Sequence, residues 1–174
     1  MAGDEWISGS WEGREGVAAY RSEWLGETLV ERITFCDGGL SLYNSLLPAP
    51  ECCREGLLDL VRFWLFASDQ IVDKAFDSGA EPFAYYSPVT QPLVRTGDGA
   101  SASHLWLGLR MDKNRRVAVT GEADFEAAVA QGLLTPQEVA QGEQRIRKLT
   151  ASAAAKRWPP PFVRNFAIVK EAND

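Results

Sequence analysis

The chain has 174 residues, of which 45% are hydrophobic and 24% charged, and its formal net charge is -6. That length and composition are typical of one globular domain with its own core, and they exclude disorder over the whole chain. The acidic balance argues against a nucleic-acid partner, and the short basic clusters at Arg115 and Arg116 and at Arg145, Arg147 and Lys148 are interpreted as solvated faces.

The sequence contains no segment typical of a membrane span or a secretory leader. No run approaches about 18 apolar residues. The three cysteines are Cys36 and the adjacent pair Cys52 and Cys53, and their odd number favours reduced thiols. His104 is the single histidine, so a zinc site built on these cysteines is not expected. We therefore expect a cytoplasmic protein with no membrane partner.

Strand-like segments alternate with turns in the first part of the chain. Thr28–Phe35 is rich in β-branched residues, and Leu40–Leu46 alternates between apolar and polar side chains. The intervening Cys36–Gly39 supplies glycines that a tight hairpin needs, and Pro48 ends the second segment. The pattern predicts a β-hairpin here.

The next segments continue the strand pattern. Leu57–Phe66 is apolar and fits either a strand or a short buried helix, since periodicity does not decide at this length. Ile71–Phe76 is predicted to be a strand, with a turn at Asp77–Gly79. Phe83–Ser87 is its expected partner, and Pro88 and Pro92 are expected to end it.

A third predicted hairpin joins Leu105–Met111 to Arg116–Thr120. Helical patterns follow it. Ala123–Ala130 is the first expected helix, and Gly132 closes it. Thr135–Glu138 is a capping box with proline at the first helical position, and the helix that it starts is expected to run to about Ala155.

Trp158 and three prolines end the second helix, and Phe162–Val169 is predicted to pack back as an extended arm. Strands first and helices last predict an α+β fold: an antiparallel β-barrel or strongly curved sheet followed by two C-terminal helices. We expect one domain over residues 1–174, with 158–174 as the C-terminal arm.

Several short motifs between Asp73 and Ala155 follow one another in the same order as in the members of a known family. They are Asp77-Ser78-Gly79, then Tyr85-Tyr86, then Pro92, then Leu107-Gly108-Leu109, and then Thr120–Glu126 with AAVAQGLLTPQEV. With them the chain resembles the FomD-like phosphohydrolases, a β-barrel family similar to nucleoside tri- and diphosphatases. The resemblance implies a barrel with a helix pair, and an active site in which carboxylates hold divalent metal ions that bind the phosphate.

The chain departs from that family where the metal-binding acids are expected. The resemblance implies an amide or acid at Pro88 and aspartates at Gly108, Gly121 and Ala123, and none of these residues has a side-chain oxygen. Water replaces one missing ligand more readily than four. Metal-dependent hydrolysis in the manner of the family is therefore not expected, and neither is a cofactor.

Other acids leave a relocated metal site open as an alternative. Glu122 and Asp124 are the fallback ligands, with Asp112 and Asp73 as further members. However, Glu122 and Asp124 fall at a helix start, where acids are favoured by the helix dipole. Asp112 falls in a hairpin turn. These roles account for the same residues without a metal.

Four residues are candidate catalytic groups. Tyr85 and Tyr86 alternate between the faces of a strand, so one of them points into the barrel and is either a hydrogen-bond donor or packing. Lys74 is a phosphate or oxyanion anchor if it points inward, and a solvated residue if it does not. His104 is a candidate acid or base, although a lone histidine is more often a surface residue.

Three further residues are candidate ligand contacts: Trp106, Arg110 and Trp64. Trp106, Gly108 and Arg110 are expected on one side of their strand, so Trp106 and Arg110 line the pocket if that side faces inward. Gly, Ala and Pro in place of acids predict a roomier and less polar barrel interior.

The sequence leads to one functional hypothesis and two alternatives. The first is a repurposed barrel that binds a largely apolar small molecule without metal, as an isomerase or cyclase in secondary metabolism. The second is a metal-dependent nucleotide or phosphoester hydrolase. The third is a ligand-binding protein without catalysis. A small-molecule partner is expected in each case, a homodimer is left open, and no nucleic acid is expected.

Overall fold

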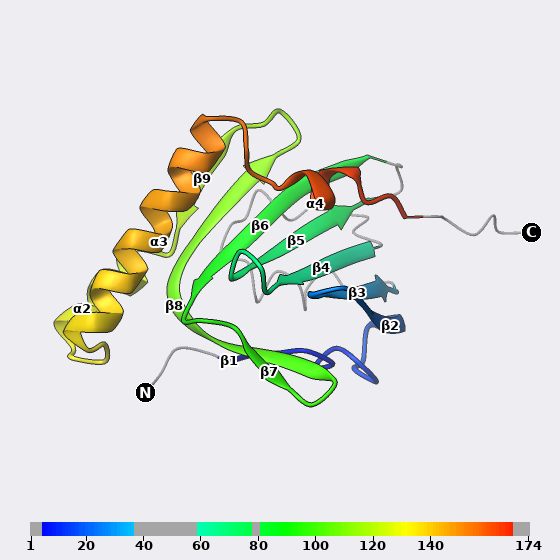
Figure 1. The fold of residues 1–174 in the computed structure, drawn as a ribbon, viewed down its shortest axis with the longest axis horizontal. Helices are drawn as coiled ribbons and strands as arrows, with labels where there is room; N and C mark the ends of the chain where they lie inside the picture. Colours follow the sequence, from blue (N-terminus) through cyan, green and yellow to red (C-terminus); the bar gives the residue numbers. More distant parts are fainter. Residues whose placement is uncertain (1–4, 37–58, 78–80, 169–174) are drawn as a thin grey trace, which may run out of the picture.

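The computed structural model describes residues 5–36, 59–77 and 81–168. Within them, a strongly curved antiparallel sheet comes first along the chain and helices follow (Figure 1). This confirms the predicted fold class. The strands are β1 Glu5–Ile7, β2 Val17–Leu25, β3 Thr28–Phe35, β4 Asp59–Leu65, β5 Gln70–Phe76, β6 Pro82–Thr90, β7 Val94–Thr96, β8 Gly99–Asp112 and β9 Val117–Thr120.

The sheet runs in the order β1-β8-β6-β5-β4-β3-β2, and β7 and β9 both pair with β8. From β2 to β6, each strand pairs antiparallel with the next described strand. The long strand β8, with 14 residues, pairs with β1, β6, β7 and β9. Because β1 and β2 end the path of described strands, the sheet forms a half-barrel.

The ambiguous segment at Leu57–Phe66 is a strand over its described residues. β4 pairs with β3 on one side and with β5 on the other. All seven residues of β4 are buried. Burial on both faces removes the alternation that marks a half-exposed strand, which is why the pattern left a helix open.

One strand is longer than predicted, because β6 continues past Pro88 to Thr90. On the β5 side, the register ends at Tyr86, opposite Asp73. On the β8 side, the register shifts between Pro88 and Thr90. Pairing with β5 has ended before Pro88, and a proline is tolerated in a strand beside a bulge. The expectation that Pro88 ends the strand was therefore wrong.

The sheet has a core on each face. We call one the N-terminal face, because Trp6 and Trp11 from residues 5–16 pack on it. Its buried sheet residues include Leu29, Ile33, Leu60, Trp64, Ile71 and Tyr86. The other is the helix face, where Val61, Phe63, Val72, Leu109 and Met111 pack with Trp158 and Val163 from the C-terminal part.

Three helices follow the sheet in the described residues: α2 Glu122–Ala130, α3 Pro136–Ala154 and the short α4 Pro161–Asn165. The predicted capping box is confirmed. The Thr135 hydroxyl accepts a hydrogen bond from the Glu138 N–H, and the Glu138 carboxylate accepts one from the Thr135 N–H. α3 lies along β8 and β9 on the outside of the sheet (Figure 1).

The C-terminal arm differs in part from its prediction, because α4 lies within the segment that was expected to be extended. Pro161 is its first residue, where a proline is pre-organised for the helix. The Lys74 ammonium of β5 donates to the carbonyls of Val163, Arg164 and Phe166, at 2.8, 3.0 and 2.7 Å. These contacts hold the end of α4 against the helix face.

Some predicted features lie outside the described residues. They are the strand at Leu40–Leu46, the glycines of its turn, the cysteine pair at 52 and 53, and most of the Asp77–Gly79 turn. Among the helices that the structure describes, none is long and apolar enough to cross a membrane.

Candidate functional site

Two of the four positions where a metal-binding acid was expected, Gly108 and Gly121, carry no room for one. A Cβ atom on Gly108 would lie 2.5 Å from the hydroxyl oxygen of Tyr86, which is itself buried. Gly121 has a φ of 78°, and a Cβ there would collide with the carbonyl oxygen of Trp106. Ala123 is exposed in the first turn of α2. Packing has therefore closed the two glycine positions to a carboxylate.

The fallback ligands do not form a metal site either. Glu122 and Asp124 are exposed in the first turn of α2. The Asp112 carboxylate accepts hydrogen bonds from the backbone N–H groups of Asn114 and Arg116 in its turn. Over residues 5–36, 59–77 and 81–168, no group of three or more His, Cys, Asp or Glu side chains could hold a metal ion. The described residues do not fit the metal centre that the resemblance implies.

A buried ion pair occupies the centre of the N-terminal face. Arg62 of β4 and Asp73 of β5 are opposite each other in register, and two hydrogen bonds of 2.8 Å join guanidinium to carboxylate. Both side chains are almost fully buried, and the guanidinium lies 4.2 Å from the centre of the Trp6 ring. Burial raises the pKa of the Asp73 carboxyl, and Arg62 opposes that rise.

A second carboxylate, Glu31 of β3, is fully buried on the same face and has three donors. They are the Gly9 backbone N–H at 2.7 Å, the Tyr20 hydroxyl at 2.6 Å and the Trp64 indole N–H at 2.6 Å. Burial and the Glu31 carboxylate together raise the pKa of Tyr20. Trp64, a predicted ligand contact, thus serves to satisfy Glu31, and its role toward a ligand stays a prediction.

Other predicted site residues gather near this network. Tyr86 and Arg110 are opposite each other on β6 and β8. The His104 Nε2 lies 3.1 Å from the Leu107 carbonyl oxygen, and its ring centre is 6.2 Å from that of Trp6. The structure therefore brings Tyr86, Arg110 and His104 to one region of the sheet, and their catalytic and binding roles stay predictions.

Trp106 does not share the side of Arg110 as predicted. Its φ of 65° interrupts the alternation of β8, and its side chain packs against the cluster that α2 and α3 form with the sheet. The register explains the difference. Residues 104 and 108 of β8 pair with Thr90 and Pro88, so three β8 residues face one residue of β6.

Tyr85 and Lys74 lie on the helix face, opposite each other in register. Burial lowers the pKa of Lys74 and raises that of Tyr85. The three ammonium hydrogens of Lys74 match the three carbonyls that it contacts, so a ligand would have to displace one of them. The Tyr85 ring contacts that of Trp158, with 6.5 Å between their centres.

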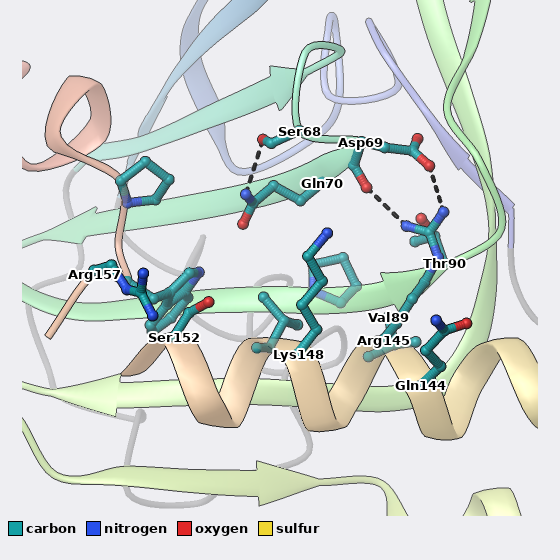
Figure 2. Close-up of a pocket in the computed structure, with 14 residues that line it drawn as sticks. Ser68, Asp69, Gln70, Val89, Thr90, Gln144, Arg145, Lys148, Ser152 and Arg157 are labelled. Carbon is teal, nitrogen blue, oxygen red and sulfur yellow. Dashed lines mark hydrogen bonds and ion pairs between the residues drawn. The ribbon is translucent and has the colours of Figure 1, made fainter. Parts of the chain in front are cut away.

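A cleft lies between α3 and the sheet, on the helix face. We call it the α3 cleft; it is bounded by the turn at residues 68–70, by residues 88–90 of β6, by α3 from Gln144 to Ser152, and by residues 157–160. Its volume is about 300 Å³. Figure 2 shows Lys148 rising from α3, between Ser152 and Arg145, toward the turn at residues 68–70.

The cleft combines basic side chains with two buried polar atoms that lack a hydrogen-bond partner. Arg145, Lys148 and Arg157 line it. The indole N–H of Trp158 and the side-chain oxygen of Gln70 are the unpartnered atoms. Such atoms are uncommon in native proteins, so each one requires an explanation.

This cleft was not predicted from the sequence, and Arg145 and Lys148 were expected on a solvated face. Arg147, in the same cluster, is indeed exposed and pairs with Glu143. Residues three and four apart on a helix share a face, so Arg145, Lys148 and Ser152 form one stripe of α3 while Arg147 falls on another. That spacing was the available signal.

The fold was compared with known proteins. No protein-family model matches the chain, and no curated protein matches it at the significance required. Solved structures do match. The complex of FomD with CDP has a TM-score of 0.63 at 18% identity, and the match covers 93% of this chain and 90% of that chain.

Two further structures are similar to a comparable degree. The phosphatase SC4828 with the non-hydrolyzable nucleotide GPCP has a TM-score of 0.58 at 17% identity, with 80% of this chain and 72% of that chain covered. A DUF402 protein of unknown function from Rhodococcus sp. RHA1 has a TM-score of 0.58 at 14% identity, with 90% and 86% covered. The chain therefore has a FomD-like fold. At these identities the likeness shows the fold alone.

Proposed function

We propose that the chain binds a small molecule in the α3 cleft and does so without a carboxylate-held metal ion. The observation that carries the proposal is the cleft itself, about 300 Å³ in volume, whose lining residues Trp158 and Gln70 each have a buried side-chain atom without a hydrogen-bond partner. That volume is at the lower end of the range for ligand pockets. A few convergent polar groups on a partly apolar wall are typical of such pockets.

The similar structures support small-molecule binding by this fold. FomD is in complex with CDP and SC4828 with a nucleotide analogue. Phosphatase chemistry like that named for SC4828 is the second candidate for this chain. It has less support, because Gly108 and Gly121 are closed to acids and the described residues offer no group of metal ligands.

The reaction that fits a metal-free site is an isomerisation or cyclisation. A rearrangement within one molecule needs shape and a few hydrogen bonds, and no hydrolytic water or redox partner. Tyr85 contacts the ring of Trp158 but is not among the residues that line the cleft, so its catalytic role stays a prediction. A cytoplasmic location and a role in secondary metabolism remain expectations from the sequence.

Blocking the cleft tests the binding proposal. Ser152 lines the cleft, and the neighbouring Ala151 is exposed on α3. The probes are anilinonaphthalene sulfonate and its uncharged relative N-phenyl-1-naphthylamine, followed by fluorescence. We expect Ser152→Trp to abolish binding of whichever probe binds the wild-type protein more tightly, and Ala151→Trp to preserve that binding. Addition of EDTA should leave probe binding to the wild-type protein unchanged. Equal binding to both variants would place the probes elsewhere and overturn the proposal.

A separate assay tests the second candidate. Nucleoside diphosphates are incubated with the protein with and without Mn²⁺, and phosphate release is measured. We expect no turnover above that of buffer with metal. Metal-dependent hydrolysis that Glu122→Ala abolishes would show that a relocated metal site exists and that the metal-free account is wrong.

A further inference from the structure

The charges that line the α3 cleft are unbalanced. Three basic side chains and one acid, Asp69, are present among its described lining residues, which leaves a net charge of +2. Arg145 is committed to Asp69, since its guanidinium contacts both the carboxylate and the backbone carbonyl of that residue. The Asp69 carboxylate is also held by the Leu93 N–H at 2.7 Å. Lys148 and Arg157 have no acidic partner in the part of the chain that the structure describes.

A buried donor points to the same chemistry. Trp158 is only 3% exposed, lines the cleft, and its indole N–H has no acceptor. An indole nitrogen donates and never accepts, so its missing partner is an acceptor oxygen. Trp64 differs from Trp158 in this respect, because its indole N–H donates to the Glu31 carboxylate at 2.6 Å.

The wall also has apolar residues, since Val89, Leu149, Pro160 and Trp158 line the cleft. Val89 is buried, and Leu149 is half-buried beneath α3. Contact with these side chains favours an apolar group on the ligand, because moving that group out of water stabilises the complex. The cleft therefore offers both basic and apolar side chains to one ligand.

We infer that the α3 cleft takes an organic acid: a compact apolar body with one acidic group. The inference rests on the proposed binding function and adds the class of ligand. The acidic group accepts from the Trp158 N–H and lies near Lys148 and Arg157. The Gln70 side-chain oxygen accepts from a hydroxyl or amide of the ligand. A charge of +2 suits a single acidic group without a metal, whereas a polyphosphate carries more negative charge than these side chains balance.

The two fluorescent probes named above separate the effect of the ligand's charge on affinity from that of its shape. Anilinonaphthalene sulfonate carries one acidic group, and N-phenyl-1-naphthylamine has the same ring system without it. We expect the sulfonate to bind the wild-type protein more tightly. Its affinity should fall with added salt, because Lys148 and Arg157 are exposed and screened, while that of the amine should not.

Single variants on one helix then assign the charge. Lys148→Ala should weaken the sulfonate by about threefold to tenfold, the scale of a partly exposed charged contact. Arg147→Ala removes the same charge from the exposed side of α3 and should leave the affinity unchanged. Trp158→Phe keeps an aromatic ring without the N–H and should also weaken the sulfonate, with thermal unfolding as the check on folding.

The outcomes distinguish this inference from the function on which it rests. If Ser152→Trp abolishes binding but Lys148→Ala and Arg157→Ala leave the sulfonate affinity unchanged, the cleft binds small molecules and the organic-acid inference is overturned. If Ser152→Trp has no effect, the binding proposal itself fails. A loss of sulfonate affinity in Lys148→Ala, with the amine unaffected, supports both.

Discussion

The N-terminal face of the sheet and the α3 cleft differ in whether their buried polar groups and charges have partners. On the N-terminal face, Arg62 and Asp73 neutralise each other, and Glu31 has three donors. In the cleft, Trp158 and Gln70 each keep a buried atom without a partner, and Lys148 and Arg157 lack acids among the described residues. A buried polar group left unpaired costs free energy.

That difference separates a site of stability from a site of binding. A network whose members are all satisfied makes the fold specific, and it leaves little for a ligand to gain. Unpaired groups at a cleft become favourable when a ligand supplies the partner. Chemistry-bearing residue types alone would have pointed to the N-terminal face, where Trp64, Tyr86 and Arg110 lie among the predicted site residues. Their hydrogen-bonding state points to the cleft.

The largest expected effect tests the structural role of the N-terminal face. Asp73→Ala leaves the Arg62 guanidinium without its bidentate partner in the core. We expect a loss of about 3–5 kcal/mol in the free energy of unfolding, measured with urea. The double variant Arg62→Met with Asp73→Leu should recover most of it, because it buries no charge. A loss under about 1 kcal/mol in Asp73→Ala would contradict the view that this pair supports the fold.

The next effect concerns the closed metal position at Gly121. Gly121 and Gly132 have φ values of 78° and 69°, but only at Gly121 would a Cβ meet backbone, the Trp106 carbonyl. Gly132→Ala should therefore cost about 1 kcal/mol for the left-handed conformation, and Gly121→Ala about 3 kcal/mol. Thermal and urea unfolding measure both. Equal costs would show that position 121 can take a side chain and that an acid there was lost for another reason.

Lys74 is expected to hold α4 on the sheet. Lys74→Met keeps much of the apolar stem and removes three hydrogen bonds, so we expect a loss of about 2 kcal/mol. Amide exchange should accelerate in residues 161–166. Lys113→Met, in an exposed turn, is the control. Unchanged exchange around α4 would indicate that the apolar contacts of Val163 and Phe166 suffice.

The smallest effect is a pH dependence that involves Tyr20. Its pKa is raised in the folded protein by burial and by Glu31, so its contribution is complete below the unfolded pKa near 10 and is lost as pH rises above it. Because Tyr20 is partly exposed, the loss by pH 11 should be about 0.5 kcal/mol. Tyr20→Phe should show a shallower decline than wild type between pH 9 and 11 in urea unfolding. Identical slopes would mean that Glu31 does not affect the Tyr20 hydroxyl.

Much of the fold was predictable because local chemistry specifies it. Thr135 and Glu138 form the capping box that their spacing predicts, and Thr28–Phe35 and Ile71–Phe76 fall within strands as expected. Pro88 was misjudged because a bulge is a tertiary feature that depends on the partner strands. The helix α4 was missed because Lys74, distant in sequence, supplies the contacts at its end.

The site was harder to predict than the fold. Glu31, Arg62 and Asp73 look like solvated strand residues, and their burial follows from strand pairing across the sheet. The cleft joins α3 to a turn more than 70 residues away, as the contact of Arg145 with Asp69 shows. The losses at Gly108 and Gly121 were visible in the sequence. That Tyr86 and the Trp106 carbonyl occupy those positions was not.

The indole N–H resonances give the most direct test of the account. Trp64 and Trp158 are the contrasting pair, the first bound to Glu31 and the second unpartnered. Variants Trp64→Phe and Trp158→Phe assign their signals in a ¹⁵N–¹H spectrum. On titration with anilinonaphthalene sulfonate, we predict that the Trp158 signal moves and the Trp64 signal stays. A shift of Trp64 with Trp158 unmoved would place the ligand on the N-terminal face and contradict the account.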